Sequence, residues 1–150
     1  MTSKRIIPWG IQVVREGGLP AIAVFVFHVV ASSGFDAYAY FPALDIPMHF
    51  LGGMAIAYLF HRASITASAC GIIGPFHRVT HAVLVVSLTC TAAVFWEFAE
   101  FTVDRFFLAR SQLGLTDTLA DMFLGICGGI TLLAATRFGG RVEEPESTSP

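Results

Sequence analysis

The sequence predicts an all-α membrane protein with four transmembrane helices in a compact bundle. Hydrophobic residues make up 55% of the 150 residues and charged residues only 13%, whereas soluble domains carry about 25% charged residues. Four apolar stretches lie at 19–40, 44–62, 79–101 and 114–136. The length of each stretch is close to the roughly 20 residues that a helix needs to cross the hydrocarbon core of a bilayer. The predicted transmembrane domain therefore covers 19–138.

The first stretch has the weakest pattern of the four. Its apolar centre, from Leu19 to Ala31, is short, and the polar run SSGFD follows it at 32–36. A cleaved signal peptide is therefore an alternative to a retained span. Residues 1–18 precede the stretch, and Trp9 within them suits the headgroup region of a membrane. We expect a retained span with a cytoplasmic or interfacial lead-in.

The positions of the basic residues predict how the four spans are oriented. Seven Lys and Arg residues fall on one side of the membrane and two on the other; the seven are Lys4, Arg5, Arg15, Arg62, Arg78, Arg137 and Arg141, and the two are Arg105 and Arg110. Because cytoplasmic loops carry an excess of Lys and Arg, both termini are predicted to be cytoplasmic, in a bacterial inner membrane. Residues 63–78 then form a cytoplasmic connection, and 139–150 a disordered cytoplasmic tail.

Composition also excludes several classes of protein. The net charge of −2 argues against a nucleic-acid binder, which would carry a basic face. Lys4 is the single lysine, so neither a Walker motif nor a Schiff-base lysine is available. Cys70, Cys90 and Cys127 lie far apart and form no C-x-x-C pair, so no disulfide framework or thiolate metal site is indicated.

Seven of the eleven acidic residues map to the predicted outer ends of the helices: Asp36, Asp45, Glu97, Glu100, Asp104, Asp117 and Asp121. The pairs Asp45–His49 and Asp117–Asp121 are spaced i and i+4, and Glu100 follows Glu97 at i+3, so each set shares one helix face. Small residues continue these faces toward the cytoplasm: Gly52, Gly53, Cys90, Ala93, Gly125 and Gly128. The pattern predicts closely packed helices below a polar pocket.

Charge balance predicts the chemistry of this pocket. Ionisable groups inside a membrane are costly and are usually paired or functional. Carboxylates with one imidazole form a hard ligand set that suits Mn, Fe, Mg, Ca or Zn, and the sequence leaves the choice open. The predicted metal ligands are Asp45, His49, Glu97, Glu100, Asp117 and Asp121, and the candidate catalytic residues are Glu97, Glu100 and Asp121. No other cofactor is indicated.

Other interpretations of these residues stay open. The carboxylates would also balance by sharing protons, or would serve only as polar packing between helices. Asp117 suits the first turn of a helix, and Asp36 and Asp104 suit a solvated helix end. Mid-span His28 is expected either to bridge two helices by a hydrogen bond or to reach the pocket from below. His61, His77 and His81 are expected at the cytoplasmic interface.

Three ordered motifs resemble the YjdF-like family of bacterial inner-membrane proteins and, more distantly, VanZ-like membrane proteins. The motifs are LDIPMHFLGG, FWEFAEF and SQLGLTDTLADMFLGICGG. The residues that fall on the family pattern are Asp45, His49, Glu97, Glu100, Gln112, Asp117, Thr118, Asp121 and Met122. The resemblance covers about residues 40–130 and implies a membrane protein with a shared polar site, but no established activity.

The expected function is metal-dependent hydrolysis of a lipid or headgroup substrate at the outer face, with membrane lipids as partners. One alternative is proton- or cation-coupled transport, and another is a non-catalytic assembly partner. A homo-oligomer is also open, because Gly125 and Gly129 form a G-x-x-x-G spacing that permits helix association.

Overall fold

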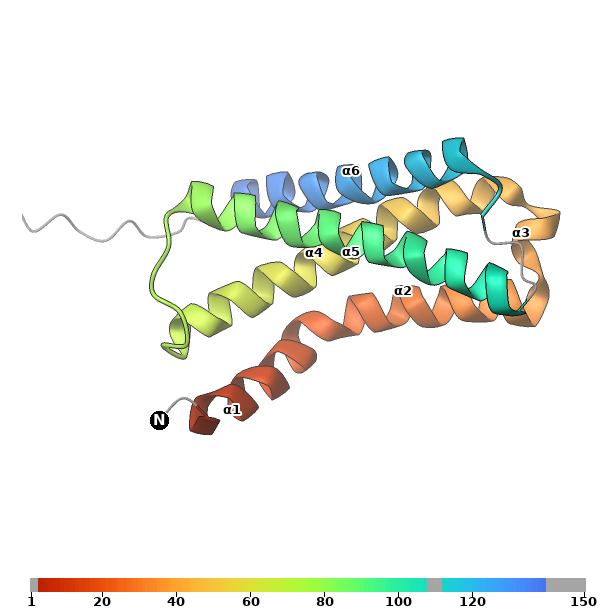
Figure 1. Cartoon of the computed structure of the whole chain (residues 1–150). Helices are drawn as coiled ribbons and strands as arrows, with labels where there is room; N and C mark the ends of the chain where they lie inside the picture. Colours follow the sequence, from red (N-terminus) through yellow and green to blue (C-terminus); the bar gives the residue numbers. More distant parts are fainter. Residues whose placement is uncertain (1–2, 108–111, 140–150) are drawn as a thin grey trace, which may run out of the picture.

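The computed structural model describes residues 3–107 and 112–139, and no strand occurs in these ranges. Four of its helical segments are long and apolar enough to cross a membrane: Arg5–Gly34, Pro42–Ala69, Arg78–Phe107 and Leu115–Thr136. They run back and forth along one axis (Figure 1). The prediction of an all-α protein with four spans is confirmed.

The first span is built from several helical pieces. In chain order these are α1 (Ser3–Val13), the π-helix η1 (Val14–Gly18), α2 (Leu19–Val29) and the π-helix η2 (Val30–Gly34). The helix bends between α1 and α2 (Figure 1). Helix α1 packs on α4 (Asp45–Ala69), where Trp9 Nε1 donates to the Ala63 carbonyl oxygen at 3.0 Å. The lead-in is therefore helical, and its interfacial position stays a prediction.

The π-helix η1 lies against α4. A Cβ atom on Gly17 would lie 3.0 Å from the Arg62 Cβ, so the glycine allows a close approach of the two helices. The neighbouring Glu16 carboxylate forms an ion pair with the Arg62 guanidinium. Single π-turns are frequent where a helix must redirect its side chains. This turn places Glu16 next to Arg62 of α4, whose side chain is partly buried.

Two predicted boundaries are wrong. The first apolar stretch does not stay in one helix to residue 40, because Asp36 adopts a left-handed conformation with φ of 51° and ends the segment. The short helices α3 (Ala37–Tyr40) and η3 (Pro42–Leu44) then lead into α4.

The connection predicted at 63–78 is also shorter, because α4 continues to Ala69 and α5 (Arg78–Phe107) begins after only 70–77. Hydroxyl groups in this part of α4 are satisfied within the helix: Ser64 Oγ donates to the Phe60 carbonyl and Thr66 Oγ1 to the Arg62 carbonyl, each at 2.8 Å. Such back-bonding lets Ser and Thr continue a helix whose polar composition suggests a loop.

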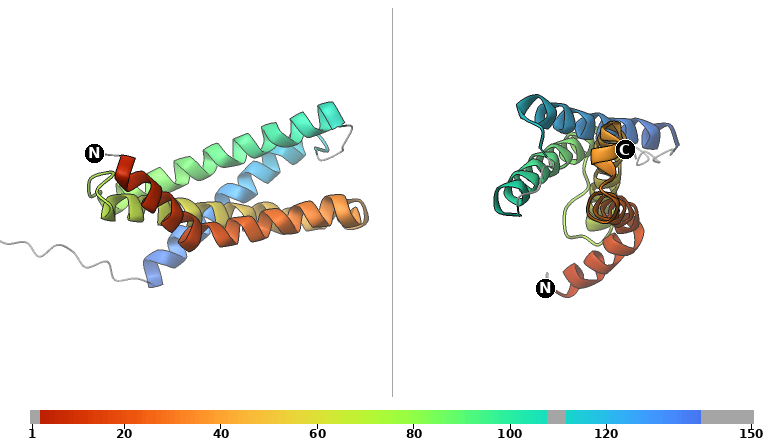
Figure 2. Two further views of the ribbon diagram at one scale, coloured as in Figure 1. Left: turned by 90° about the horizontal axis from the view of Figure 1, so that it is seen from below. Right: turned by 90° about the vertical axis from the view of Figure 1, so that its right-hand side faces the viewer.

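Helices α4 and α6 (Leu115–Gly139) touch through glycines, and α6 lies obliquely across α4 (Figure 2). A Cβ on Gly53 would collide with the backbone of Gly125, and a Cβ on Gly128 would collide with the Phe50 carbonyl. The predicted close approach of small residues is confirmed at these three glycines. Gly129 packs on Ala57 and Thr89 of the same chain, so the G-x-x-x-G face is used within the bundle.

The two ends of the bundle differ in charge. The N-terminus and the end of α6 lie at one end, together with the α4–α5 connection, and α3 lies at the other end (Figure 1). We call the end with α3 the acidic end, because the seven acids from Asp36 to Asp121 identified above lie near it. The structure does not contain a membrane, so the direction of insertion stays a prediction. Arg110, Arg141 and the predicted tail from Gly140 lie outside the described residues.

Adding a methyl group at Gly53 is expected to destabilise the bundle. Gly53→Ala forces α4 and α6 apart, and overpacking of this kind costs about 1–3 kcal/mol. The neighbouring Gly52 has nothing within 4 Å of an added Cβ, so Gly52→Ala is a matched control. Thermal unfolding in detergent should show a lower melting temperature for Gly53→Ala alone. Equal melting temperatures for the two variants would contradict the glycine contact.

Candidate functional site

Two cavities meet at the acidic end of the bundle. The larger has a volume of about 1120 Å³ and is lined by side chains from all four spans and α3, including Asp36, Asp45, Glu100, Asp117 and Asp121. The smaller, of about 370 Å³, is mostly apolar and lies between α2, α4 and α5, with α6 contributing Asp121, Met122 and Gly125. Phe25, His28, Trp96 and Asp121 line both cavities. We call the first the polar cavity and the second the apolar cleft.

His49 lies at the centre of the polar groups. Its Nε2 atom is 3.3 Å from Asp45 Oδ1, one turn earlier on α4, and 3.7 Å from Asp121 Oδ1 on α6. Asp121 is buried, with 5% of its surface exposed. One imidazole thus faces carboxylates from two helices. The crossing of α4 and α6 at Gly53 and Gly125, one turn away from these residues, brings the two helix faces together.

Helix α5 completes the arrangement. Potential ligand atoms of His49, Glu97 and Glu100 lie within 4.8 Å of one another, as do those of Asp45, His49 and Asp121. Glu97 and Glu100 are 5% and 9% exposed. His49 belongs to both groups, so the five residues form one continuous set. We call Asp45, His49, Glu97, Glu100 and Asp121 the His49 cluster.

The other predicted site residues lie around this cluster. Asp117 Oδ2 accepts from the Leu113 N–H at 3.0 Å, in the first turn of α6, and belongs to neither group of potential ligands. Asp36 lines the polar cavity from its left-handed position between η2 and α3. Asp104 Oδ2 accepts from the Gln112 N–H at 2.9 Å. These three carboxylates therefore surround the cluster rather than join it.

Gln112 holds the loop before α6 against α5. Its Nε2 atom donates to the Glu97 carbonyl oxygen and to Glu97 Oε2, each at 3.0 Å. The sequence analysis identified Gln112 through the family resemblance, without a role for it. The amide holds Oε2 of Glu97 by a hydrogen bond and leaves Oε1 of the same carboxylate able to bind another group.

The sequence analysis did not identify two aromatic residues of the site, Trp96 and Tyr38. Trp96 Nε1 donates to Glu100 Oε1 at 2.8 Å, and Tyr38 Oη lies 2.8 Å from His28 Nδ1. Burial, together with nearby Asp45 and Glu100, raises the pKa of Tyr38 to about 12, so its hydroxyl is protonated and can donate to His28. The i, i+4 spacing of Trp96 and Glu100 could have predicted their hydrogen bond, whereas no pattern in the sequence predicts the contact of Tyr38 with His28.

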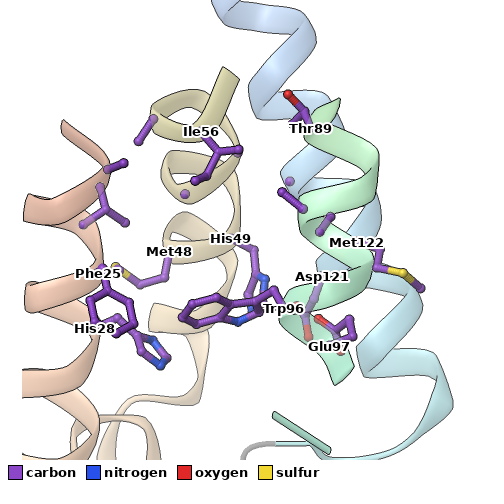
Figure 3. A pocket seen from close by; sticks show the side chains of 18 of the residues that line it. Phe25, His28, Met48, His49, Ile56, Thr89, Trp96, Glu97, Asp121 and Met122 are labelled. Atoms are coloured by element: carbon purple, nitrogen blue, oxygen red, sulfur yellow. Dashed lines mark ion pairs between the residues drawn. The ribbon is translucent and has the colours of Figure 1, made fainter. Parts of the chain in front are cut away.

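His28 fits both predictions made for it. It forms the hydrogen bond to Tyr38 and it also lines both cavities. Figure 3 shows the indole of Trp96 between Phe25 and His28 on one side and His49, Glu97 and Asp121 on the other. His61 and His81 lie far from this site. His81 Nε2 is 2.9 Å from Ser64 Oγ of α4.

The charges of the site do not balance among the described side chains. The His49 cluster has four carboxylates and one imidazole, and no Lys or Arg among the described residues lines either cavity. Carboxylates in a membrane-spanning bundle are stable only when protonated or paired with a cation. Oxygen atoms with one imidazole nitrogen suit a hard or borderline divalent ion. The donor set therefore fits a divalent metal.

A family model matches residues 17–140, and the family is described as "Predicted membrane protein (DUF2238)". The match covers all of the motifs that carry the resemblance to the YjdF-like family, and it confirms that resemblance. No curated protein and no solved structure matches the chain.

Replacing the Gln112 amide by a carboxylate is expected to destabilise the site. In Gln112→Glu two donated hydrogen bonds are lost and a negative charge faces the Glu97 carboxylate and carbonyl, whereas Gln112→Ala loses the bonds alone. Unsatisfied or repelled buried groups cost about 1–3 kcal/mol. Thermal unfolding at pH 8 should rank wild type above Gln112→Ala and Gln112→Glu last. A carboxylate variant as stable as wild type would show that Gln112 does not face Glu97.

Proposed function

This chain belongs to the DUF2238 family of predicted membrane proteins, and we propose that it binds a divalent metal ion at the His49 cluster. The observation that supports the proposal is the convergence of one imidazole and four carboxylates from three helices within the membrane-spanning bundle. Since no Lys or Arg of the described residues lines the cavities, a bound cation is the simplest source of the missing positive charge.

The cluster has four carboxylates, and one divalent ion balances the charge of only two of them. His49, Asp45 and Asp121 form one potential ligand group, and Glu97 and Glu100 approach His49 from α5. A divalent ion would polarise a phosphoryl or acyl oxygen of a bound substrate. The carboxylate that does not bind the ion is then placed to accept a proton from water as a general base. Glu97, Glu100 and Asp121 are the candidates for this role.

We propose that the reaction is hydrolysis of a lipid or headgroup substrate, at the outer face of a bacterial inner membrane. The location rests on the basic residues, because Arg5 lies in α1 and Arg78 begins α5, at the end of the bundle opposite α3 (Figure 1). The polar cavity, at about 1120 Å³, is large enough for a lipid headgroup, since small-molecule sites measure about 300–1,000 Å³.

Proton- or cation-coupled transport is the main alternative, and it would need a polar path through the bundle. Beyond the His49 cluster, Ala57, Val85 and Leu133 form a buried apolar cluster, with the glycine contacts of α4 and α6 beside it. This apolar packing favours a site that is open to one face. An assembly role would use the cluster only as polar packing.

Metal content distinguishes these functions. Elemental analysis of protein purified in mild detergent without chelator should find a stoichiometric divalent metal. His49→Ala and Asp121→Asn should lose it, because removal of even an outer ligand partner weakens metal affinity by about 10–100-fold. His77→Ala, at the other end of the bundle, and Asp36→Asn, outside both ligand groups, are the matched controls. Folded wild-type protein without metal would contradict the proposal, as would metal retained by both cluster variants.

A further inference from the structure

The apolar cleft is the feature of the molecule that the His49 cluster does not explain. It is bounded by α2 on one side and by α4 and α5 on the other. Its apolar lining includes Ala21, Ile22 and Phe25 from α2, Ile56 from α4, and Ala92 from α5. One end of the cleft reaches His49, Glu97 and Asp121, and the other reaches Thr89 and Ile56 near the middle of their helices (Figure 3).

The cleft exists because α2 packs along α4 and not along α5. No residue of α2 is buried, and Ile22 and Phe25 are each about half exposed. Trp96 of α5 reaches across to α2, with its ring centroid 6.1 Å from that of Phe25 and 5.2 Å from that of His28. This aromatic contact lies where the apolar cleft meets the polar cavity, since all three residues line both.

The size of the cleft limits what can occupy it. A transmembrane helix is about 10 Å across, whereas the cleft measures about 370 Å³ in all, so the cleft suits an occupant narrower than a helix. Water is disfavoured along walls that offer few polar partners. At the depth of the hydrocarbon core the surrounding solvent is lipid, and a single flexible hydrocarbon chain fits both the shape and the polarity.

We propose that the apolar cleft holds one hydrocarbon chain of a membrane lipid, whose headgroup lies in the polar cavity at the His49 cluster. The order of the two cavities matches a lipid of the leaflet at the acidic end. The lining of the polar cavity includes α3 residues at that end of the bundle, and the apolar cleft extends from His49 to Ile56, toward the middle of α4 (Figure 3). The inference rests on the proposed function and deepens it, because it makes a lipid with an intact acyl chain the substrate.

The geometry assigns a separate role to each end of the lipid. The chain is held by apolar contact, at about 0.8 kcal/mol for each buried CH₂ group, and the headgroup meets the carboxylates of the cluster. Trp96 lies at the boundary and is tied to Glu100 by its indole N–H. Chain binding therefore brings the bonds between chain and headgroup next to the cluster. A lipid enters sideways, between α2 and α5, past the contact of Trp96 with Phe25 and His28.

Photolabelling tests the chain site directly. The full-length protein in mild detergent is mixed with one equivalent of a phosphatidylglycerol that carries a diazirine on one acyl chain, irradiated, digested and mapped by mass spectrometry. We expect label on the α2 and α5 peptides that line the cleft. Ala92→Trp fills the cleft and should reduce this label to background. Val94→Trp adds the same side chain to the same helix but away from both cavities, and should label as wild type.

A second pair of variants, in α2, controls for the possibility that substitutions in α5 cause misfolding. Ala21→Phe narrows the cleft from α2 and should also abolish the label, whereas Ala23→Phe, which lines neither cavity, should not. Labelling that is equal in Ala92→Trp and Val94→Trp, or label spread over the outward-facing surfaces, would overturn the inference. The metal content of each variant is measured in parallel. Metal without cleft label overturns this inference alone, and cleft label without metal overturns the proposed function.

Discussion

The cost of placing charge inside a membrane is the constraint on which the rest of this structure depends. Four carboxylates and one imidazole gather where the helices are long and apolar enough to span a bilayer. Interhelical polar contacts contribute only about 0.6–2 kcal/mol each, so clustering like charges is a poor way to hold helices together. A bound cation turns the same arrangement into an attractive one, because each carboxylate then faces positive charge.

Helix α4 makes this arrangement geometrically available. It packs against α2, α5 and α6, and it carries His49 one turn from the glycines that contact α6. Because Gly53 and Gly125 remove the side chains between α4 and α6, Asp121 approaches within 3.7 Å of His49. The same helix supports α2 at a distance from α5, which leaves the apolar cleft beside the cluster. The His49 cluster and the apolar cleft are thus two results of one packing pattern.

The sequence predicted the parts of the site that depend on spacing along a single helix. Asp45 and His49, or Glu97 and Glu100, share a face by helical geometry alone, and the four spans follow from apolar length. Contacts between helices were harder to predict. The bond of Gln112 to Glu97 and the pairing of His28 with Tyr38 depend on how loops return to the bundle. Likewise, the π-turns at 14–18 and 30–34, and the cleft that α2 leaves beside α5, have no periodic signal in the sequence.

The measurement that tests the central claim most directly is the melting temperature of the metal-loaded protein with and without a chelator, in wild type and in the double variant Glu97→Gln and Asp121→Asn. Ligands that bind only the folded state stabilise it by a free energy that grows with the logarithm of their concentration divided by Kd. The account predicts that chelation lowers the melting temperature of wild type, by exposing the repulsion within the His49 cluster, and has a smaller effect on the double variant, which keeps only Asp45 and Glu100 of the four carboxylates. A wild-type melting temperature that does not respond to chelation would contradict it.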